Sequence, residues 1–218
     1  MPCKDVERIR AEVVAALSAL TCVRRIDSFG SIAIGSFDEW SDLDLLVSCE
    51  GTETPWLAAA VIRSLRKVAF YRMFTGVPQP SGRYWFCGES PFRRLDVSFH
   101  SPAEHERVCL AGVRQGHPVN VHPEYVAQRS PDGAADARLL SPMHPVKVTA
   151  QETEVGRLLY NHLETAKEHL RGRQAKRSIA ESRAALLHAA SQTPMMVGGG
   201  DLVSFIAYVD EFIQRALN

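Results

Sequence analysis

The sequence predicts an α/β fold of the α+β type, in which helices flank a β-sheet and a helical bundle follows it. Three observations predict this fold. Apolar and polar residues alternate in short segments of the first hundred residues, as they do in strands with one buried face. Apolar residues recur at helical spacing near the start of the chain and again after residue 149. Segments rich in Gly, Pro and Ser separate these stretches and indicate turns.

The elements of the first part follow one another along the chain. Residues 6–20 carry apolar side chains at helical spacing and predict an amphipathic helix. Five predicted strands follow, two of them joined as a hairpin by the turn at residues 88–91. The strands are expected at residues 23–29, 41–47, 70–75, 84–87 and 92–100, with helical segments at 32–35, 56–68 and 103–113 and a loop at 77–82.

The second part is predicted to be helical. Residues 115–145 are rich in Pro, Gly, Asp and Ser, and we expect them to be mostly irregular, as a lid, a linker or a poorly ordered excursion. Three helices then form a small antiparallel bundle, at residues 149–170, 174–191 and 202–213, with Asp201 as the N-cap of the last one. We therefore expect a first domain of residues 1–146 and a helical domain of residues 147–218.

A pair of carboxylates, Asp42 and Asp44, alternates with Leu43 and Leu45. On a strand both acids project to the same face, with α-carbons roughly 6.5–7 Å apart. Two anions at about 4 Å repel by about 4 kcal/mol at an effective dielectric near 20. The pair therefore calls for a cation, and Mg²⁺ takes such oxygen ligands together with phosphate oxygens and water.

Gly30 and Ser31 stand at the end of the preceding predicted strand. Glycine lets the backbone approach a ligand closely, and a serine at the start of a helical turn adds a hydroxyl beside free N–H groups. A third acid, Asp96, alternates with Leu95 and Val97 on the hairpin. Because neighbouring strands lie about 4.8 Å apart, Asp96 is expected within reach of the aspartate pair.

Gly30-Ser31, the following Asp42-Leu43-Asp44 and the later Asp96 resemble the DNA polymerase β-like nucleotidyltransferase superfamily. The resemblance is close over residues 29–47 and loose as far as Asp96. It implies a mixed sheet flanked by helices, with Asp42, Asp44 and Asp96 as catalytic ligands of Mg²⁺, two ions in all. It also implies that Gly30, Ser31 and Ser41 contact ATP or another NTP. Ile34 departs from the pattern, because many relatives carry arginine there.

Antibiotic nucleotidyltransferases and other small-molecule members of the superfamily also place a helical bundle after the catalytic domain. That resemblance implies an acceptor between the two domains and basic bundle residues at the triphosphate. Lys176 is the first choice for this contact and Arg173 the second, although a solvated basic helix face is the alternative. Asp96 and Glu164 are the candidates for the general base, and His162 is expected to be a core histidine.

The composition of the chain limits the classes of partner that we expect. Lys and Arg number 25, as do Asp and Glu, whereas extended nucleic-acid binders usually show a basic surplus. We therefore expect a small-molecule or protein acceptor and regard nucleic acid as unfavoured. The 5 cysteines include no Cys-x-x-Cys pair, so disulfides and zinc are not expected. With neither a signal peptide nor a bilayer-spanning apolar run, the sequence predicts a cytoplasmic location and no membrane partner.

The bundle sequence also allows another hypothesis. Arg183 to His188, and Arg157 to His162, have the Arg-to-His spacing that marks HEPN ribonuclease toxins, which often accompany minimal nucleotidyltransferases. On that interpretation the chain is a toxin–antitoxin-like protein that cleaves RNA through the bundle or adds AMP to a protein partner. A third hypothesis is a degenerate nucleotide-binding module, which the presence of all three aspartates disfavours.

Overall fold

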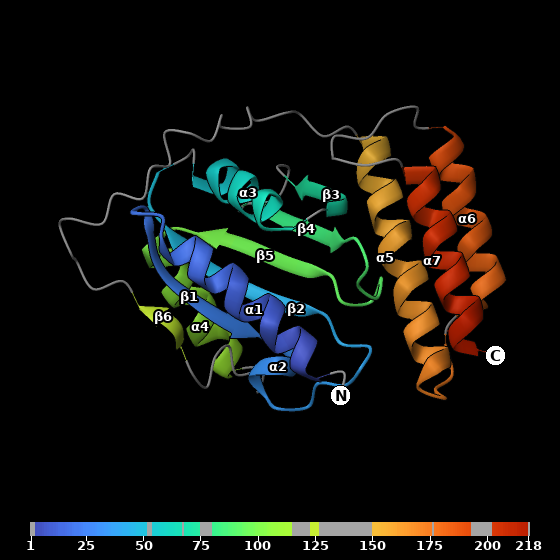
Figure 1. The fold of residues 1–218 in the computed structure, drawn as a ribbon, viewed down its shortest axis with the longest axis horizontal. Helices are drawn as coiled ribbons and strands as arrows, with labels where there is room; N and C mark the ends of the chain where they lie inside the picture. The colour runs from blue at the N-terminus through green and yellow to red at the C-terminus, as the bar shows by residue number, and fades with distance from the viewer. Residues whose placement is uncertain are drawn as a thin grey trace.

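A six-stranded sheet of order β3-β4-β5-β2-β1-β6 forms the first part of the protein (Figure 1). The computed structural model describes residues 3–51, 54–66, 68–74, 80–114, 123–126, 150–175, 177–192 and 202–217. β2 and β5 are parallel, whereas the other neighbouring strands are antiparallel. The predicted α/β fold with a mixed sheet is confirmed by strands β1 (Val23–Phe29), β2 (Leu43–Cys49), β3 (Val68–Phe74), β4 (Ser81–Phe86), β5 (Leu95–His100) and β6 (Pro123–Val126).

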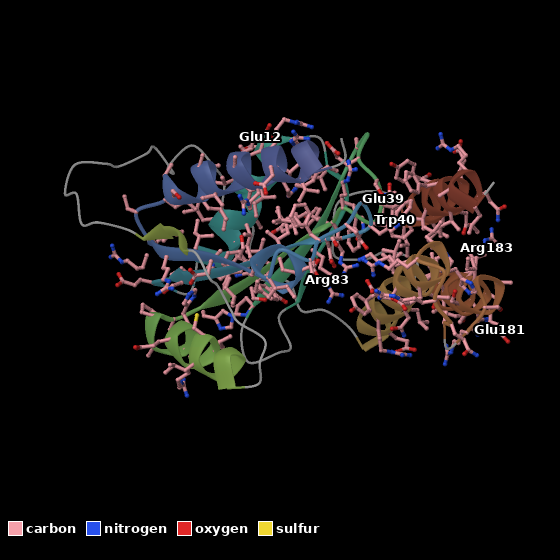
Figure 2. All side chains as sticks on the ribbon, turned by 90° about the horizontal axis from the view of Figure 1, so that it is seen from below. Glu12, Glu39, Trp40, Arg83, Glu181 and Arg183 are labelled. Atoms are coloured by element: carbon pink, nitrogen blue, oxygen red, sulfur yellow. The ribbon has the colours of Figure 1, made fainter. Side chains whose placement is uncertain are left out.

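Helices cover both faces of the sheet. α1 (Cys3–Ser18) contacts β1 and α3 (Thr54–Leu65), whereas α4 (Pro102–Arg114) contacts β2 and β5. Figure 2 shows α1 on one side of the sheet and α4 on the other. A single helical turn, α2 (Gly30–Ala33), leads away from the end of β1.

The core follows from strand alternation. Leu43, Leu45 and Val47 are buried on the α1 side of the sheet, together with Leu95 and Val97 of the neighbouring strand and the apolar faces of α1 and α3. Because side chains alternate along a strand, Asp44 and Asp96 project to the opposite face, where α4 lies. Packing of the apolar set thus fixes the direction of the acids.

Three helices, α5 (Ala150–Leu170), α6 (Ile179–Ser191) and α7 (Leu202–Leu217), lie side by side at one end of the sheet (Figure 1). Ser178 begins α6 with a reciprocal capping box to Glu181. The core of the bundle also includes Trp85 and Phe92 from the hairpin of β4 and β5. The predicted boundary between residues 146 and 147 lies outside the described residues.

Two stretches predicted to be a loop or mostly irregular contain strand residues. β6 (Pro123–Val126) lies within the stretch expected to be irregular, and it pairs with β1 at the edge of the sheet. β4 begins at Ser81, inside the predicted loop. Both segments become strands because a neighbouring strand offers its backbone groups, and proline at the start of an edge strand is compatible with that pairing. Asp201, the predicted N-cap, lies outside the described residues.

Candidate active site

The parallel pairing of β2 and β5 brings three carboxylates together. Asp44 and Asp96 are direct partners in the register of these strands, and Asp42 lies immediately before β2. One oxygen from each of Asp42, Asp44 and Asp96 lies within 4.8 Å of the other two. The structure therefore assembles the acidic group from two segments that are more than fifty positions apart in the sequence.

Gly30 approaches this group from the end of β1. Its φ is 68°, and a Cβ built there would lie 2.5 Å from Asp44 Oδ2. Any side chain would both strain the backbone and collide with the carboxylate. Glycine is thus required because the turn passes directly against Asp44. Ser31 follows it as the second residue of α2.

Two buried cations contact the aspartates. Arg94 is 2% exposed, forms an ion pair with Asp42, donates from Nε to Asp96 Oδ1 at 3.0 Å and lies 3.4 Å from Glu164 Oε1. Lys167 of α5 is equally buried, with Nζ at 3.4 Å from Asp42 Oδ1 and 3.1 Å from Glu164 Oε1. A helix of the bundle therefore contributes charge directly to the acidic group.

A cavity of about 360 Å³ opens where the sheet faces α5. Arg83, labelled in Figure 2, lies at this junction and donates from Nε to Asp96 Oδ2 at 3.1 Å. The ring of Tyr160 on α5 lies 4.8 Å from the guanidinium carbons of both Arg83 and Arg94. The cavity is lined by Phe29, Asp42, Asp44, Ser81, Gly82, Arg83, Arg94, Asp96, Val97, Ser98, Tyr160 and Glu164.

The aspartates differ in electrostatic environment. Burial opposes ionisation of Asp42, but the charges of Arg94 and Lys167 outweigh it and lower its pKa. Burial, reinforced by the charges of Asp42 and Asp96, raises the pKa of Asp44 well above its usual range. Burial also raises the pKa of Asp96 despite the nearby arginines. Among the described residues Asp44 forms no ion pair, so its carboxylate is the one with the most to gain from a metal ion.

The other predicted nucleotide contacts lie in different places. Ser41 is 3% exposed, and its hydroxyl donates to Asp38 Oδ1 at 2.8 Å, closing the turn before β2. Arg173 is exposed, lies 3.6 Å from Glu168 and does not line the cavity. Lys176 lies outside the described residues. Glu164 reaches the cavity and contacts both Arg94 and Lys167.

The histidines of the bundle do not form an exposed Arg–His pair with their sequence partners. His162 is fully buried, with Nδ1 at 2.8 Å from Ser182 Oγ and Nε2 at 3.5 Å from Asp210, which confirms it as a core histidine. Arg183 donates to Asp210 at 2.6 Å, whereas His188 is exposed. Among the described residues Arg183 and His188 form no hydrogen bond with each other, and no observation favours a ribonuclease site here.

Sequence reasoning assigned no role in the site to Lys167, Tyr160 or Arg94. A signal existed for Lys167, because it follows the core residue Leu163 by one turn and so places a charge on an otherwise apolar face. Arg94 precedes Asp96 by two residues, and the two side chains therefore share a face of the strand. Neither signal shows that the side chain contacts Asp42, because these contacts depend on how β2, β5 and α5 pack together.

Comparison with solved structures finds similar chains, among them that of Cid1, in a structure on the structural plasticity behind its RNA terminal uridylyl transferase activity. The two chains are 13% identical, the TM-score is 0.38, and the match covers 75% of this chain and 41% of that one. This chain thus spans less than half the length of that structure. No protein-family model and no curated protein matches the chain. Within the described part, no helix is long and apolar enough to cross a membrane.

Proposed function

We propose that this protein is a metal-dependent nucleotidyltransferase that moves a nucleoside monophosphate, most simply AMP, from an NTP to a hydroxyl of a small molecule and releases pyrophosphate. The observation that carries the proposal is the grouping of Asp42, Asp44 and Asp96 within 4.8 Å on the wall of a cavity. The approach of Gly30 to Asp44 supports it, because the turn that would hold phosphates adjoins the carboxylates that would hold metal.

The three carboxylates fit magnesium. They supply oxygen donors, which Mg²⁺ prefers, and the raised pKa values of Asp44 and Asp96 reflect buried acids that a cation would stabilise in the charged form. Asp42, Asp44 and Asp96 would hold the ions. When bound, Mg²⁺ would neutralise triphosphate charge and align the in-line displacement.

The chain's own cations complete the proposed phosphate site. Gly30 and Ser31 would present the backbone and a hydroxyl to the triphosphate. Lys167 has three N–H donors and contacts two acids, so a third donor would be left for a phosphate oxygen. Arg94, held by Asp96 and Glu164, would add fixed positive charge where negative charge develops.

The acceptor would lie on the bundle side. A second cavity of about 460 Å³ shares Glu164 with the first and is otherwise lined by Asn161, Thr165, Glu168, Gln174, Ala175 and Arg177. On this proposal residues 1–146 hold the nucleotide and residues 147–218 hold the acceptor. Asp96 and Glu164 both line the first cavity, and on this proposal one of them would take the proton of the acceptor hydroxyl.

Calorimetric titration of each NTP, with and without Mg²⁺, tests the proposal without knowledge of the acceptor. We expect metal-dependent binding of one NTP by the wild type, lost in Asp42→Asn/Asp44→Asn. Glu39→Gln, which removes an exposed carboxylate close to Asp42 in sequence, is the matched control and should bind normally. Absence of binding for every NTP, or full binding by the double variant, would overturn the proposal.

Acceptor class is tested by pyrophosphate release in the presence of candidate acceptors. Small polyhydroxylated compounds should stimulate release in the wild type but not in Asp42→Asn/Asp44→Asn. If the protein extended an RNA primer, the proposal of nucleotidyl transfer would stand, but the proposal of a small-molecule acceptor would be refuted. Labelling of a protein with AMP would refute it in favour of a protein acceptor.

A further inference from the structure

A second group of metal-ligating side chains lies beneath α4, separate from the three aspartates. It consists of Asp27 on β1 and of His105 and Cys109 on α4, and one ligand atom from each lies within 4.8 Å of the others. Asp27 pairs with Leu46 across β1 and β2, so it projects to the face of the sheet that α4 covers. The site joins this helix to the sheet.

The spacing on α4 suits a shared ligand. His105 and Cys109 are four residues apart on a helix, so their side chains lie on one face, one turn apart. A tetrahedral ion with bonds of about 2.0–2.3 Å holds its ligand atoms roughly 3.3–3.8 Å apart. Small side-chain rotations would bring atoms within 4.8 Å to such separations.

Unused donor capacity points to a ligand. His105 is 2% exposed and its Nε2 lies 2.5 Å from Asp27 Oδ2, yet within the described residues its Nδ1 has no hydrogen-bond partner. His100, whose ring centroid lies 6.3 Å from that of His105, is 7% exposed and also leaves Nδ1 without a partner in this part of the chain. Buried polar atoms are nearly always paired. Both imidazoles thus have a nitrogen atom that is available to a ligand beside the group of Asp27, His105 and Cys109.

We propose that Asp27, His105 and Cys109 bind one divalent transition-metal ion of the Zn²⁺ class, with the fourth position open to water or to His100. The donor set combines carboxylate oxygen, imidazole nitrogen and sulfur, which Zn²⁺ accepts in tetrahedral geometry. The Cys109 thiol would lose its proton to solvent as the sulfur–metal bond forms. No change of oxidation state is involved.

Arg25 is the competitor for this site. Its Nε lies 2.7 Å from the same Asp27 oxygen, but its side chain is 41% exposed and can move into solvent when the ion takes its place. The simpler interpretation is a buried Asp27–His105 pair that only fastens α4. That interpretation gives Cys109 no role. The experiment therefore tests whether the Cys109 sulfur binds a metal ion.

Titration with Co²⁺, which reports its ligands by absorption, separates the two interpretations. The protein is first stripped with a chelator and kept reduced, and Asp42→Asn/Asp44→Asn serves as the background so that the aspartate site cannot contribute. We expect one tightly bound Co²⁺ with a thiolate-to-cobalt charge-transfer band, displaced by Zn²⁺. Cys109→Ser should lose the band and weaken binding by at least about tenfold. Cys87→Ser, at an exposed cysteine, should keep both.

Cys109→Ser is nearly isosteric, so it preserves the fold where His105→Ala could disturb the core; circular dichroism verifies this. A bound ion without the charge-transfer band, or a band unchanged in Cys109→Ser, would overturn the proposal. Because the background variant lacks two aspartates, failure here leaves the nucleotidyltransferase proposal untouched. Loss of NTP binding in that variant likewise leaves this proposal untouched.

Discussion

Gly30 shows how a single atom can decide the geometry of the site. A Cβ at this position would lie 2.5 Å from Asp44 Oδ2, while the backbone has a φ of 68°. Gly35 has the same φ but no atom within 4 Å of an added Cβ. An alanine at Gly35 would therefore cause backbone strain alone, whereas an alanine at Gly30 would cause the same strain and also crowd the Asp44 carboxylate.

Gly30→Ala is expected to lose Mg²⁺-dependent NTP binding, because its methyl group displaces Asp44. Gly35→Ala should impose the same backbone strain as Gly30→Ala and lower the free energy of unfolding by about 1 kcal/mol. It should nevertheless bind NTP as the wild type does. Calorimetry and urea unfolding of both variants measure these effects. Equal loss of binding in the two would show that Asp44 is not crowded.

Lys167 and Arg173 offer rival sources of positive charge for the triphosphate. The geometry favours Lys167, which contacts Asp42, over the exposed Arg173. A hydrogen bond to a charged group contributes about 1.5–3 kcal/mol. Lys167→Met should therefore weaken NTP binding by roughly 10- to 100-fold, whereas Arg173→Met should change it little. The reverse ranking would restore Arg173 as the phosphate contact.

At the scale of elements, the bundle is joined to the sheet by the buried cations of the site, by aromatic packing and by an exposed clamp, the ion pair of Arg171 with Asp38. Trp85 lies 5.3 Å from Phe205 and Phe92 lies 5.8 Å from Phe212, measured between ring centroids. Arg171 donates to both oxygens of Asp38 at 2.7 and 2.8 Å. The aromatic pairs bury apolar surface, whereas the ion pair of Arg171 with Asp38 is exposed and therefore screened by solvent.

Phe92→Ala should lower the free energy of unfolding by about 3–5 kcal/mol, since Phe92 is fully buried between hairpin and bundle. We also expect NTP binding to weaken, because α5 carries Lys167. Denaturant unfolding and calorimetry measure the two effects. A variant with an exposed apolar residue removed, Val203→Ala, should alter neither. Unchanged stability in Phe92→Ala would contradict the packing described here.

The clamp predicts a dependence on pH. The hydrogen bond from Arg171 lowers the pKa of Asp38 to about 2, below its unfolded value of 3.8. The stabilisation is therefore fully present above the unfolded pKa and is lost as the pH falls through about 2. The difference in unfolding free energy between the wild type and Asp38→Asn should shrink across this window. A difference that grows on acidification would contradict the assignment.

At the scale of the whole molecule, charge balance limits the partners. Basic and acidic residues are equal in number, and much of the basic charge at the site already faces acids. We expect a single-stranded RNA oligonucleotide to bind weakly in fluorescence anisotropy, with a shallow dependence on salt. Tight binding that falls steeply with salt would contradict this expectation and favour a nucleic-acid acceptor.

Periodicity predicted most of the elements, because apolar alternation and helical spacing are local properties of the chain. The strand that carries Asp44, the helix after residue 102 and the buried face of His162 all follow from such patterns. The edge strand β6 could not be predicted, since only four residues form it and its pairing partner is remote in sequence. Predictions thus fail where a distant backbone decides the local structure.

The sequence by itself determined that this chain carries three aspartates in or next to strands and a glycine before a turn, because residue type and alternation are local. Only the tertiary structure decided which cations contact those acids. Arg94, the residue before β5, and Lys167 of α5 both form ion pairs with Asp42. It also decided the grouping of Asp27 with His105, whose positions differ by 78. Ligand groups form where distant elements pack, and packing depends on the whole chain.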